Sequence, residues 1–316
     1  MRVAFMGTPD FAAASLMGVI ESRHDVVAVV SQPDRPSGRG RKVIPTPVAA
    51  LAREHGCPLD QSNTVATRAF REWLRSHTPD VVVVAAFGKI LGPKLLSLPP
   101  LGCINVHGSL LPRWRGASPI QSALLAGDAE SGVCIMEMVS ELDAGAVLDR
   151  VATPIRPEDT SSTLHDRLAD LGATLLVEVL DRMEQRSIRA EPQPLEGVTF
   201  APQFTKADGN IDWSEPADAI ARRLRAFSPW PGCRTRHERR AEWVKVHPPA
   251  SVSLPPSSSS DGKPGTVLCA GPQGVDVLCG DGAILRLTRL QAPGKRVLDA
   301  RSFLAGYPLD PGDRLI

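Results

Sequence analysis

An asparagine and a histidine stand two residues apart in an otherwise apolar part of this 316-residue chain. Asn105 and His107 belong to the segment CINVH, which a glycine and a serine follow. If the segment is extended, both side chains point to one face, because side chains alternate along a strand. An amide and an imidazole side by side can polarise a carbonyl group, and the imidazole can also transfer a proton. This pair is therefore the candidate catalytic centre.

A carboxylate that could join the pair is Asp143, which precedes Ala144 and Gly145 at a predicted turn before a strand. An aspartate before a glycine is most often a turn-capping residue. The alternative is that the chain returns this carboxylate to His107. The pattern alone leaves both interpretations open.

The elements that must position these residues alternate along the N-terminal part. Apolar runs at 2–7, 26–30, 80–86 and 103–107 are separated by helical patterns at 11–21, 47–55 and 65–76. Uniformly apolar strands separated by helices predict an α/β fold, a Rossmann-like and mostly parallel sheet with helices on both faces. Ligands bind beyond the carboxyl ends of such strands, where Asn105 and His107 lie. The turn GTPD at 7–10 lacks the GxGxxG pattern, which argues against a dinucleotide site.

The C-terminal part has a different pattern. A predicted helix at 217–226 precedes short strand-like runs at 242–247, 265–269, 274–278 and 283–291. Several short strands with turn signals predict a small, OB-like β-barrel. We expect a catalytic domain at 1–188, a polar, proline-containing linker at 189–206 and the barrel at 207–316. The Pro/Ser-rich stretch 248–265 is expected to be a loop within the barrel.

Basic residues gather in two places. Residues 31–47 form a Pro/Gly/Arg-rich segment longer than the roughly two to six residues usual between such elements, and its cations suit phosphate contacts. These are Arg35, Arg39, Arg41 and Lys42. A second basic window runs from Arg222 to Lys245. Charge runs are often only solvated faces, but two clusters in two domains make a polyanionic partner a reasonable hypothesis.

Composition excludes several classes of protein. The chain is 42% hydrophobic and 22% charged, as in ordinary globular proteins, and it has no apolar run near the ~20 residues of a membrane span. Asp10 interrupts the first apolar stretch, which argues against a signal peptide. The six cysteines form no CxxC pair, so we expect buried thiols of a cytoplasmic protein, with no zinc site and no disulfides.

Several motifs together resemble the methionyl-tRNA formyltransferase family, from residue 1 to Leu315. NVHGSLLP at 105–112 with LDAG at 142–145 is similar to the formyltetrahydrofolate-using transferases in general. The basic segment QPDRPSGRG at 32–40 and the C-terminal domain narrow the resemblance to the tRNA enzymes. Further matching stretches are GTPDFA at 7–12, FAP at 200–202, IDW at 211–213, RAFSPWP at 225–231 and PGDRL at 311–315.

The resemblance implies transfer of a formyl group from 10-formyltetrahydrofolate to the α-amino group of methionine on initiator tRNA. The family's catalytic residues fall on Asn105, His107 and Asp143. The resemblance also implies a folate-contacting segment, phosphate contacts from the first basic cluster, a tRNA-binding barrel and a cytoplasmic monomer without a metal. The folate segment comprises Ser109, Leu110, Leu111 and Pro112, and the tRNA contacts are Arg35, Arg39, Arg41 and Lys42.

One departure from the family concerns the linker, where Gln203 stands at the end of FAPQ and the family often has lysine. This weakens a single expected tRNA contact. Two alternatives remain open. The first is another formyltetrahydrofolate-dependent transferase or hydrolase that acts on a small substrate, which should lack the basic segment and the basic barrel. The second is a non-catalytic RNA-binding protein on a degenerate fold, against which the intact Asn105, His107 and Asp143 argue.

Overall fold

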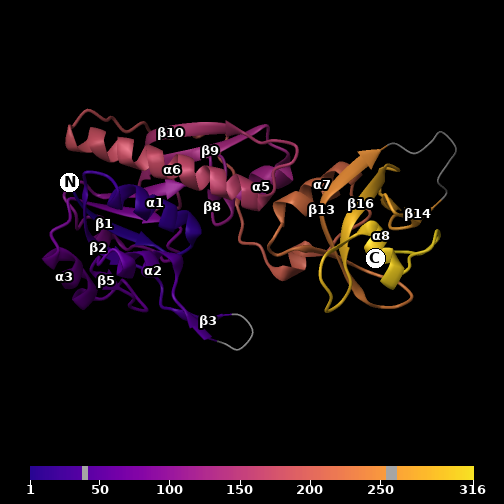
Figure 1. The fold of residues 1–316 in the computed structure, drawn as a ribbon. Coiled ribbons are helices and arrows are strands. Elements are labelled where there is room, and N and C mark those ends of the chain that lie inside the picture. Colours follow the sequence, from indigo (N-terminus) through magenta and orange to yellow (C-terminus); the bar gives the residue numbers. More distant parts are fainter. Residues whose placement is uncertain (38–41, 254–261) are drawn as a thin grey trace. The chain divides into compact units, whose positions relative to one another are not determined.

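The structure, a computed structural model, describes residues 1–37, 42–253 and 262–316 (Figure 1). It consists of two compact units. Unit 1 comprises Met1–Pro119, Glu130–Pro154 and His165–Ala201, and unit 2 comprises Ile120–Ala129, Ile155–Leu164 and Pro202–Ile316. The chain thus passes between the units more than once, and the domain boundaries expected from the sequence stay a proposal. Within the described ranges, no helix combines the length and apolarity needed to cross a membrane.

Unit 1 is built on a seven-stranded sheet in the order β10-β9-β7-β6-β1-β2-β5. Five neighbouring strands run parallel, and the last two along the chain add antiparallel pairs at one edge. This confirms the predicted mostly parallel sheet. The parallel strands are β1 (Arg2–Gly7), β2 (Asp25–Val30), β5 (Leu59–Asp60), β6 (Val81–Ala85) and β7 (Cys103–His107), and the others are β9 (Glu130–Glu137) and β10 (Val147–Pro154).

Helices cover both faces of this sheet because its central strands are apolar on both sides. One face of β1, β2 and β6 packs against Phe70 and Leu74 of α3 (Arg68–Ser76) and Leu95 of α4 (Pro93–Leu96). α6 (Ser161–Glu184) lies close to β7 and β9, since a Cβ added at Gly172 would meet Val106 and Val133 at 3.2 and 3.3 Å. Also in this unit are α1 (Asp10–Ile20) and α2 (Pro47–Glu54).

The basic segment at 31–47 differs from the expected continuous loop. Residues Arg35–Ser37 form β3, which pairs in antiparallel register with β4 at Lys42–Ile44. The segment is therefore partly a hairpin, and its two strands of three residues each are too short to show a periodic pattern. Arg39 and Arg41 lie outside the described residues.

Unit 2 carries an antiparallel sheet in the order β12-β13-β16-β15-β14, with β17 on β16. The predicted helix is α7 (Ala217–Ala226), and α5 (Pro119–Ala126) contributes most of its length to this unit. The strands are β12 (Cys233–Arg236), β13 (Trp243–Ser253), β14 (Val267–Gly271), β15 (Gly274–Leu278), β16 (Ile284–Gln291) and β17 (Leu298–Asp299), followed by α8 (Ala300–Gly306). Of the expected loop at 248–265, residues 248–253 belong to β13 instead, and residues 254–261 lie outside the described residues.

The predicted barrel is barrel-like but not closed by direct pairing of its described edge strands, β12 and β14. The C-terminal segment bridges the gap instead. Ile316 exchanges two backbone hydrogen bonds with Arg236, at 2.7 and 2.8 Å, while the Leu315 N–H donates to the Gly265 carbonyl at 2.9 Å. The backbone of the last residues thus contacts both edges of the sheet.

Most of the thiols are buried, as predicted, but Cys269 is exposed and Cys57 is half-buried. Burial raises the pKa of the Cys103, Cys233 and Cys279 thiols to about 12 and that of Cys134 to about 11. These four thiols are therefore protonated at neutral pH.

Candidate active site

The candidate site lies at the carboxyl end of β7, an interior strand of the sheet. Asn105 is paired with Val84 of β6 on one side and with Met136 of β9 on the other. Because Asn105 and His107 are two residues apart on this strand, their side chains share a face, as predicted. His107 is buried and Asn105 is half-buried. Pairing of β7 with a strand on each side holds the backbone of both residues in place.

The two ring nitrogens of His107 have different environments. Nε2 lies 2.9 Å from the Trp114 carbonyl oxygen. A carbonyl only accepts, so Nε2 carries a hydrogen and donates it. Nδ1 lies 3.7 Å from Oδ2 of Asp143, which is within ion-pair range but too long for a hydrogen bond. Nδ1 is therefore the ring nitrogen that faces Asp143.

The structure places Asp143 close to His107, which is the spatial arrangement that the second interpretation of this residue expected. Its Oδ2 accepts a hydrogen bond from the Gly116 N–H at 2.8 Å and faces the imidazole. Its backbone is left-handed, with φ of 45°, a conformation that non-glycine residues rarely adopt. The turn that contains it also needs Gly145, where an added Cβ would lie 1.8 Å from the Glu137 carbonyl oxygen.

The predicted folate segment turns its side chains largely into the protein. The Ser109 hydroxyl donates to the Arg113 carbonyl at 2.6 Å, and Leu111 packs in a core cluster with Cys134, Met136 and Val147. Leu110 lies against Gly132. A ligand at this segment, which ends at Pro112, would therefore meet mainly backbone groups.

Residues 191–201, which we call the strap, contribute contacts that the sequence analysis missed. Glu191 exchanges two backbone hydrogen bonds of 2.8 Å with Val147. β11 (Phe200–Ala201) pairs in parallel with β8 (Arg115–Gly116), beside the loop that carries the His107 acceptor. The strap is polar and proline-containing, and nothing in its composition separates it from a connector. Its role in the site is visible only in the fold.

The first basic cluster is described only in part. Arg35 is exposed, and its Nη2 donates to Oε1 of Gln32 at 3.1 Å. Lys42 begins β4. Arg39 and Arg41 lie outside the described residues, so their predicted contacts stay a prediction.

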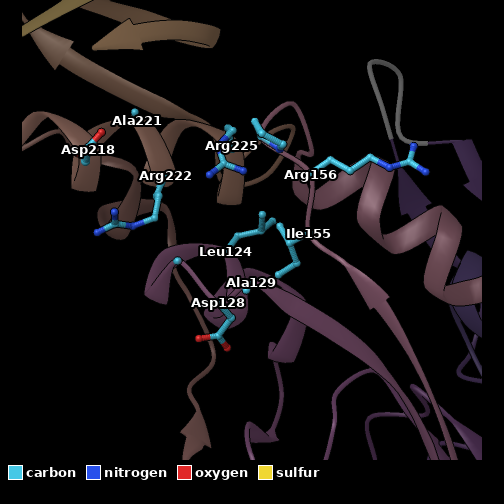
Figure 2. Close-up of a pocket in the computed structure, with 11 residues that line it drawn as sticks. Leu124, Asp128, Ala129, Ile155, Arg156, Asp218, Ala221, Arg222 and Arg225 are labelled. Atoms are coloured by element: carbon cyan, nitrogen blue, oxygen red, sulfur yellow. The ribbon is translucent and has the colours of Figure 1, made fainter. Parts of the chain in front are cut away.

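The second basic window is partly structural. Arg222 donates to the Leu125 carbonyl and Arg225 to the Asp159 carbonyl, each at 3.0 Å. Both arginines border a hollow of about 360 Å³ within unit 2, above Leu124 and Ile155 (Figure 2). Among the residues that the structure describes, none of the predicted catalytic, folate or tRNA residues lines this hollow.

A metal could be held, among the described residues, by His24, Asp181 and Glu184, whose ligand atoms lie close together. Both carboxylates are paired with Arg23, at 2.6 and 2.7 Å. None of the three belongs to the candidate active site.

Comparison with known proteins tests the resemblance. Residues 1–180 match the family model described as formyl transferase, and residues 203–308 match the model of the formyl transferase C-terminal domain. The chain is 46% identical over 314 residues to the methionyl-tRNA formyltransferase of Aromatoleum aromaticum, with 99% of this chain and 96% of the relative covered. It is 47% identical over 308 residues to that of Chromohalobacter salexigens, covering 96% and 93%. The chain belongs to the methionyl-tRNA formyltransferase family.

Solved structures confirm the fold of this formyltransferase family member. HypX from Aquifex aeolicus, in complex with tetrahydrofolic acid, superimposes with a TM-score of 0.64 at 17% identity, and the match covers all of this chain and 50% of the longer HypX chain. The sugar 3N-formyl transferase WlaRD gives a TM-score of 0.65 at 16% identity, covering 94% and 99%. Such low identities show a shared fold only, since one fold can host several substrates.

Proposed function

We propose that this protein transfers the formyl group of 10-formyltetrahydrofolate to the α-amino group of methionyl-initiator-tRNA. The observation that carries the proposal is the 3.7 Å approach of His107 Nδ1 to Asp143 Oδ2, beside Asn105, in a chain that matches formyl transferases over both of its domains. Asn105, His107 and Asp143 would be the catalytic residues.

The reaction joins the methionyl nitrogen to the formyl carbon and breaks the bond from that carbon to N10 of the folate. The attacking amine must be neutral. The tetrahedral intermediate carries an oxyanion, which the Asn105 amide and a protonated His107 can stabilise as hydrogen-bond donors. A single polar atom can lie within hydrogen-bonding distance of both Nδ1 and Oδ2. Asp143 would accept the amine proton through a water there, and the proton then passes to N10 of the departing tetrahydrofolate.

In this proposal, different parts of the chain bind the folate and the tRNA. The backbone of the segment 109–112 would contact the folate, and the cluster Arg35, Arg39, Arg41 and Lys42 would contact tRNA phosphates. Residues 207–316 would form a tRNA-binding domain, joined through 189–206 to a catalytic domain at 1–188. We further propose a monomeric, cytoplasmic enzyme that needs no metal.

A discharge assay tests the reaction and the site together. Purified protein is incubated with methionyl-initiator-tRNA and 10-formyltetrahydrofolate, and the amino acid released from the tRNA is analysed for N-formylation. We expect formylmethionine from the native protein, and a loss of at least about 100-fold in His107→Ala because general acid-base and electrostatic contributions are of that order. His55→Ala, which alters an exposed histidine, is the control.

Two other outcomes would redirect the assignment. Formate release, or formylation of a small amine with no product on tRNA, would place the protein among the hydrolases or small-substrate transferases. Binding of tRNA without any formyl product would favour the non-catalytic RNA-binding alternative.

A further inference from the structure

We propose that the strap positions both members of the His107–Asp143 pair, with Gln193 and Thr199 as its two positioning residues. The inference rests on the proposed function of that pair. Neither residue needs to touch a substrate, because each acts through a backbone group to which His107 or Asp143 is bound.

Gln193 holds the turn that presents Asp143. Its Nε2 donates to the carbonyl oxygens of Asp143 and Gly145, each at 2.8 Å. Its Oε1 accepts from Nε and Nη2 of Arg115, at 3.1 and 2.8 Å. The reverse orientation of the amide would set its donors against a guanidinium and its oxygen against two carbonyls. Four hydrogen bonds therefore hold the Gln193 side chain in one orientation.

Thr199 acts on the histidine side of the site. Its Oγ1 accepts a hydrogen bond from the Trp114 N–H at 2.9 Å, and the carbonyl of the same Trp114 accepts from His107 Nε2 at 2.9 Å. The Thr199 carbonyl also accepts from the Arg115 N–H at 2.9 Å. One peptide segment thus connects the strap to the ring nitrogen that faces away from Asp143.

The backbone of both supported residues is left-handed, with φ of 63° at Trp114 and 45° at Asp143. Non-glycine residues leave this region unless neighbouring contacts hold them there. At Asp143, relaxation would turn the carboxylate away from Gly116 and His107. At Trp114, it would move the carbonyl that orients the imidazole. The strap lies directly against this loop, because a Cβ added at Gly116 would meet the Ala201 carbonyl oxygen at 2.5 Å.

Three substitutions test the two positioning residues. Gln193→Glu keeps the length and the acceptor for Arg115 but puts an oxygen against two carbonyls. Thr199→Val keeps the branched shape but removes the acceptor, and Thr199→Ser restores it. We expect Gln193→Glu and Thr199→Val to lower kcat by about tenfold, which is the scale of one hydrogen bond, with KM for folate and tRNA within about twofold of the native values. Thr199→Ser should recover most of the native kcat.

Matched controls exclude general effects of the substitutions. Gln185→Glu places the same new charge at an exposed position in unit 1. Thr64→Val removes an exposed hydroxyl that likewise accepts from a backbone N–H, that of Ala66 at 3.2 Å. Both controls should retain native kcat.

A second readout distinguishes positioning from a purely structural role. If Thr199 acts through His107, Thr199→Val should have no further effect on the residual rate of His107→Ala. In ¹⁵N-labelled protein, the Nε2–H signal of His107 should shift in Thr199→Val, while the other six histidines stay unchanged. An equal kcat loss in the native and His107→Ala backgrounds would overturn the proposal. If Gln193→Glu does not fold, the Thr199→Val and Thr199→Ser pair decides alone.

Failure of this inference can be told apart from failure of the proposed function. Formylation by the native protein and its loss in His107→Ala, together with native kcat in both strap variants, would refute the strap and leave the function standing. A native protein without formyl transfer, or one unaffected by His107→Ala, would remove the proposed function and the strap proposal with it.

Discussion

At the scale of single residues, the site depends on backbone conformations that are costly to adopt. Trp114 and Asp143 are left-handed, each at a cost of about 1–3 kcal/mol that the surrounding contacts must offset. Hydrogen bonds from Gly116 and Gln193 hold Asp143 in place. Such strain is characteristic of functional sites, where a side chain must point in a direction that the relaxed chain would not give it.

Gly145 offers a test of this turn. In Gly145→Ala the new methyl group would meet the Glu137 carbonyl oxygen at 1.8 Å, so the backbone must shift and carry Asp143 with it. We expect a destabilisation of about 1–3 kcal/mol, typical of overpacking, and a larger relative loss of formyl transfer. Thermal unfolding and kcat measure the two effects.

The control for this prediction is Gly92→Ala, since nothing lies within 4 Å of a Cβ added at Gly92. Native activity in Gly145→Ala would show that the turn tolerates the shift and that the placement of Asp143 is less critical than its geometry indicates.

At the scale of elements, the C-terminal segment of unit 2 is anchored by the buried carboxylate of Asp313. Burial by itself would raise the pKa of Asp313. Hydrogen bonds from the Asp310 N–H and Arg239, with the His237 ring 3.4 Å away, outweigh burial and hold the pKa below its ordinary value. The segment that follows Asp313 bridges both edges of the open sheet, so this carboxylate supports the bridge.

The direction of the shift predicts an acid-sensitive contribution to stability. Because the folded pKa of Asp313 lies below the unfolded one, the contribution is complete above the ordinary carboxyl pKa of about 4 and is lost as the pH falls through the lower folded pKa. Asp313→Asn should therefore lower Tm at pH 7, and the difference from the native protein should shrink toward pH 3. Thermal unfolding across this range measures it.

Asp170→Asn, at an exposed position of α6, should show no comparable effect at either pH. A Tm difference for Asp313→Asn that does not change between pH 7 and pH 3 would mean that its effect comes from shape and not from charge.

At the scale of the whole molecule, the proposed function assigns tRNA binding to one set of basic residues and the chemistry to a different set of residues. Loss of one phosphate contact should weaken tRNA binding and reduce its salt dependence by somewhat less than one unit in the slope of log K against log salt. We expect Arg39→Ala to impair mainly transfer to tRNA, with folate binding unchanged. His107→Ala should lower transfer by at least about 100-fold while tRNA binding is retained. Filter binding or anisotropy at several salt concentrations checks both.

Arg75→Ala, at an exposed position of α3, is the matched control for the basic segment. Equal loss of tRNA binding in Arg39→Ala and His107→Ala would contradict this division of labour.

The sequence by itself determined what depends on local periodicity. Uniformly apolar strands alternating with helices predicted the mostly parallel sheet, and the two-residue spacing of Asn105 and His107 placed them on one face of β7. The hairpin within the basic segment was missed because two three-residue strands are too short to show a period.

Only the tertiary structure decided how the site is assembled. The pattern around Asp143 fitted a turn cap as well as a partner of His107, because a left-handed backbone and an approach of 3.7 Å leave no periodic signal. The strap resembled a connector, yet Gln193 reaches residues about fifty positions earlier in the chain. Likewise, Arg222 donates to a carbonyl of a distant helix. Periodicity reports which face of an element is buried, whereas hydrogen bonds between distant segments form only once packing has brought those segments together.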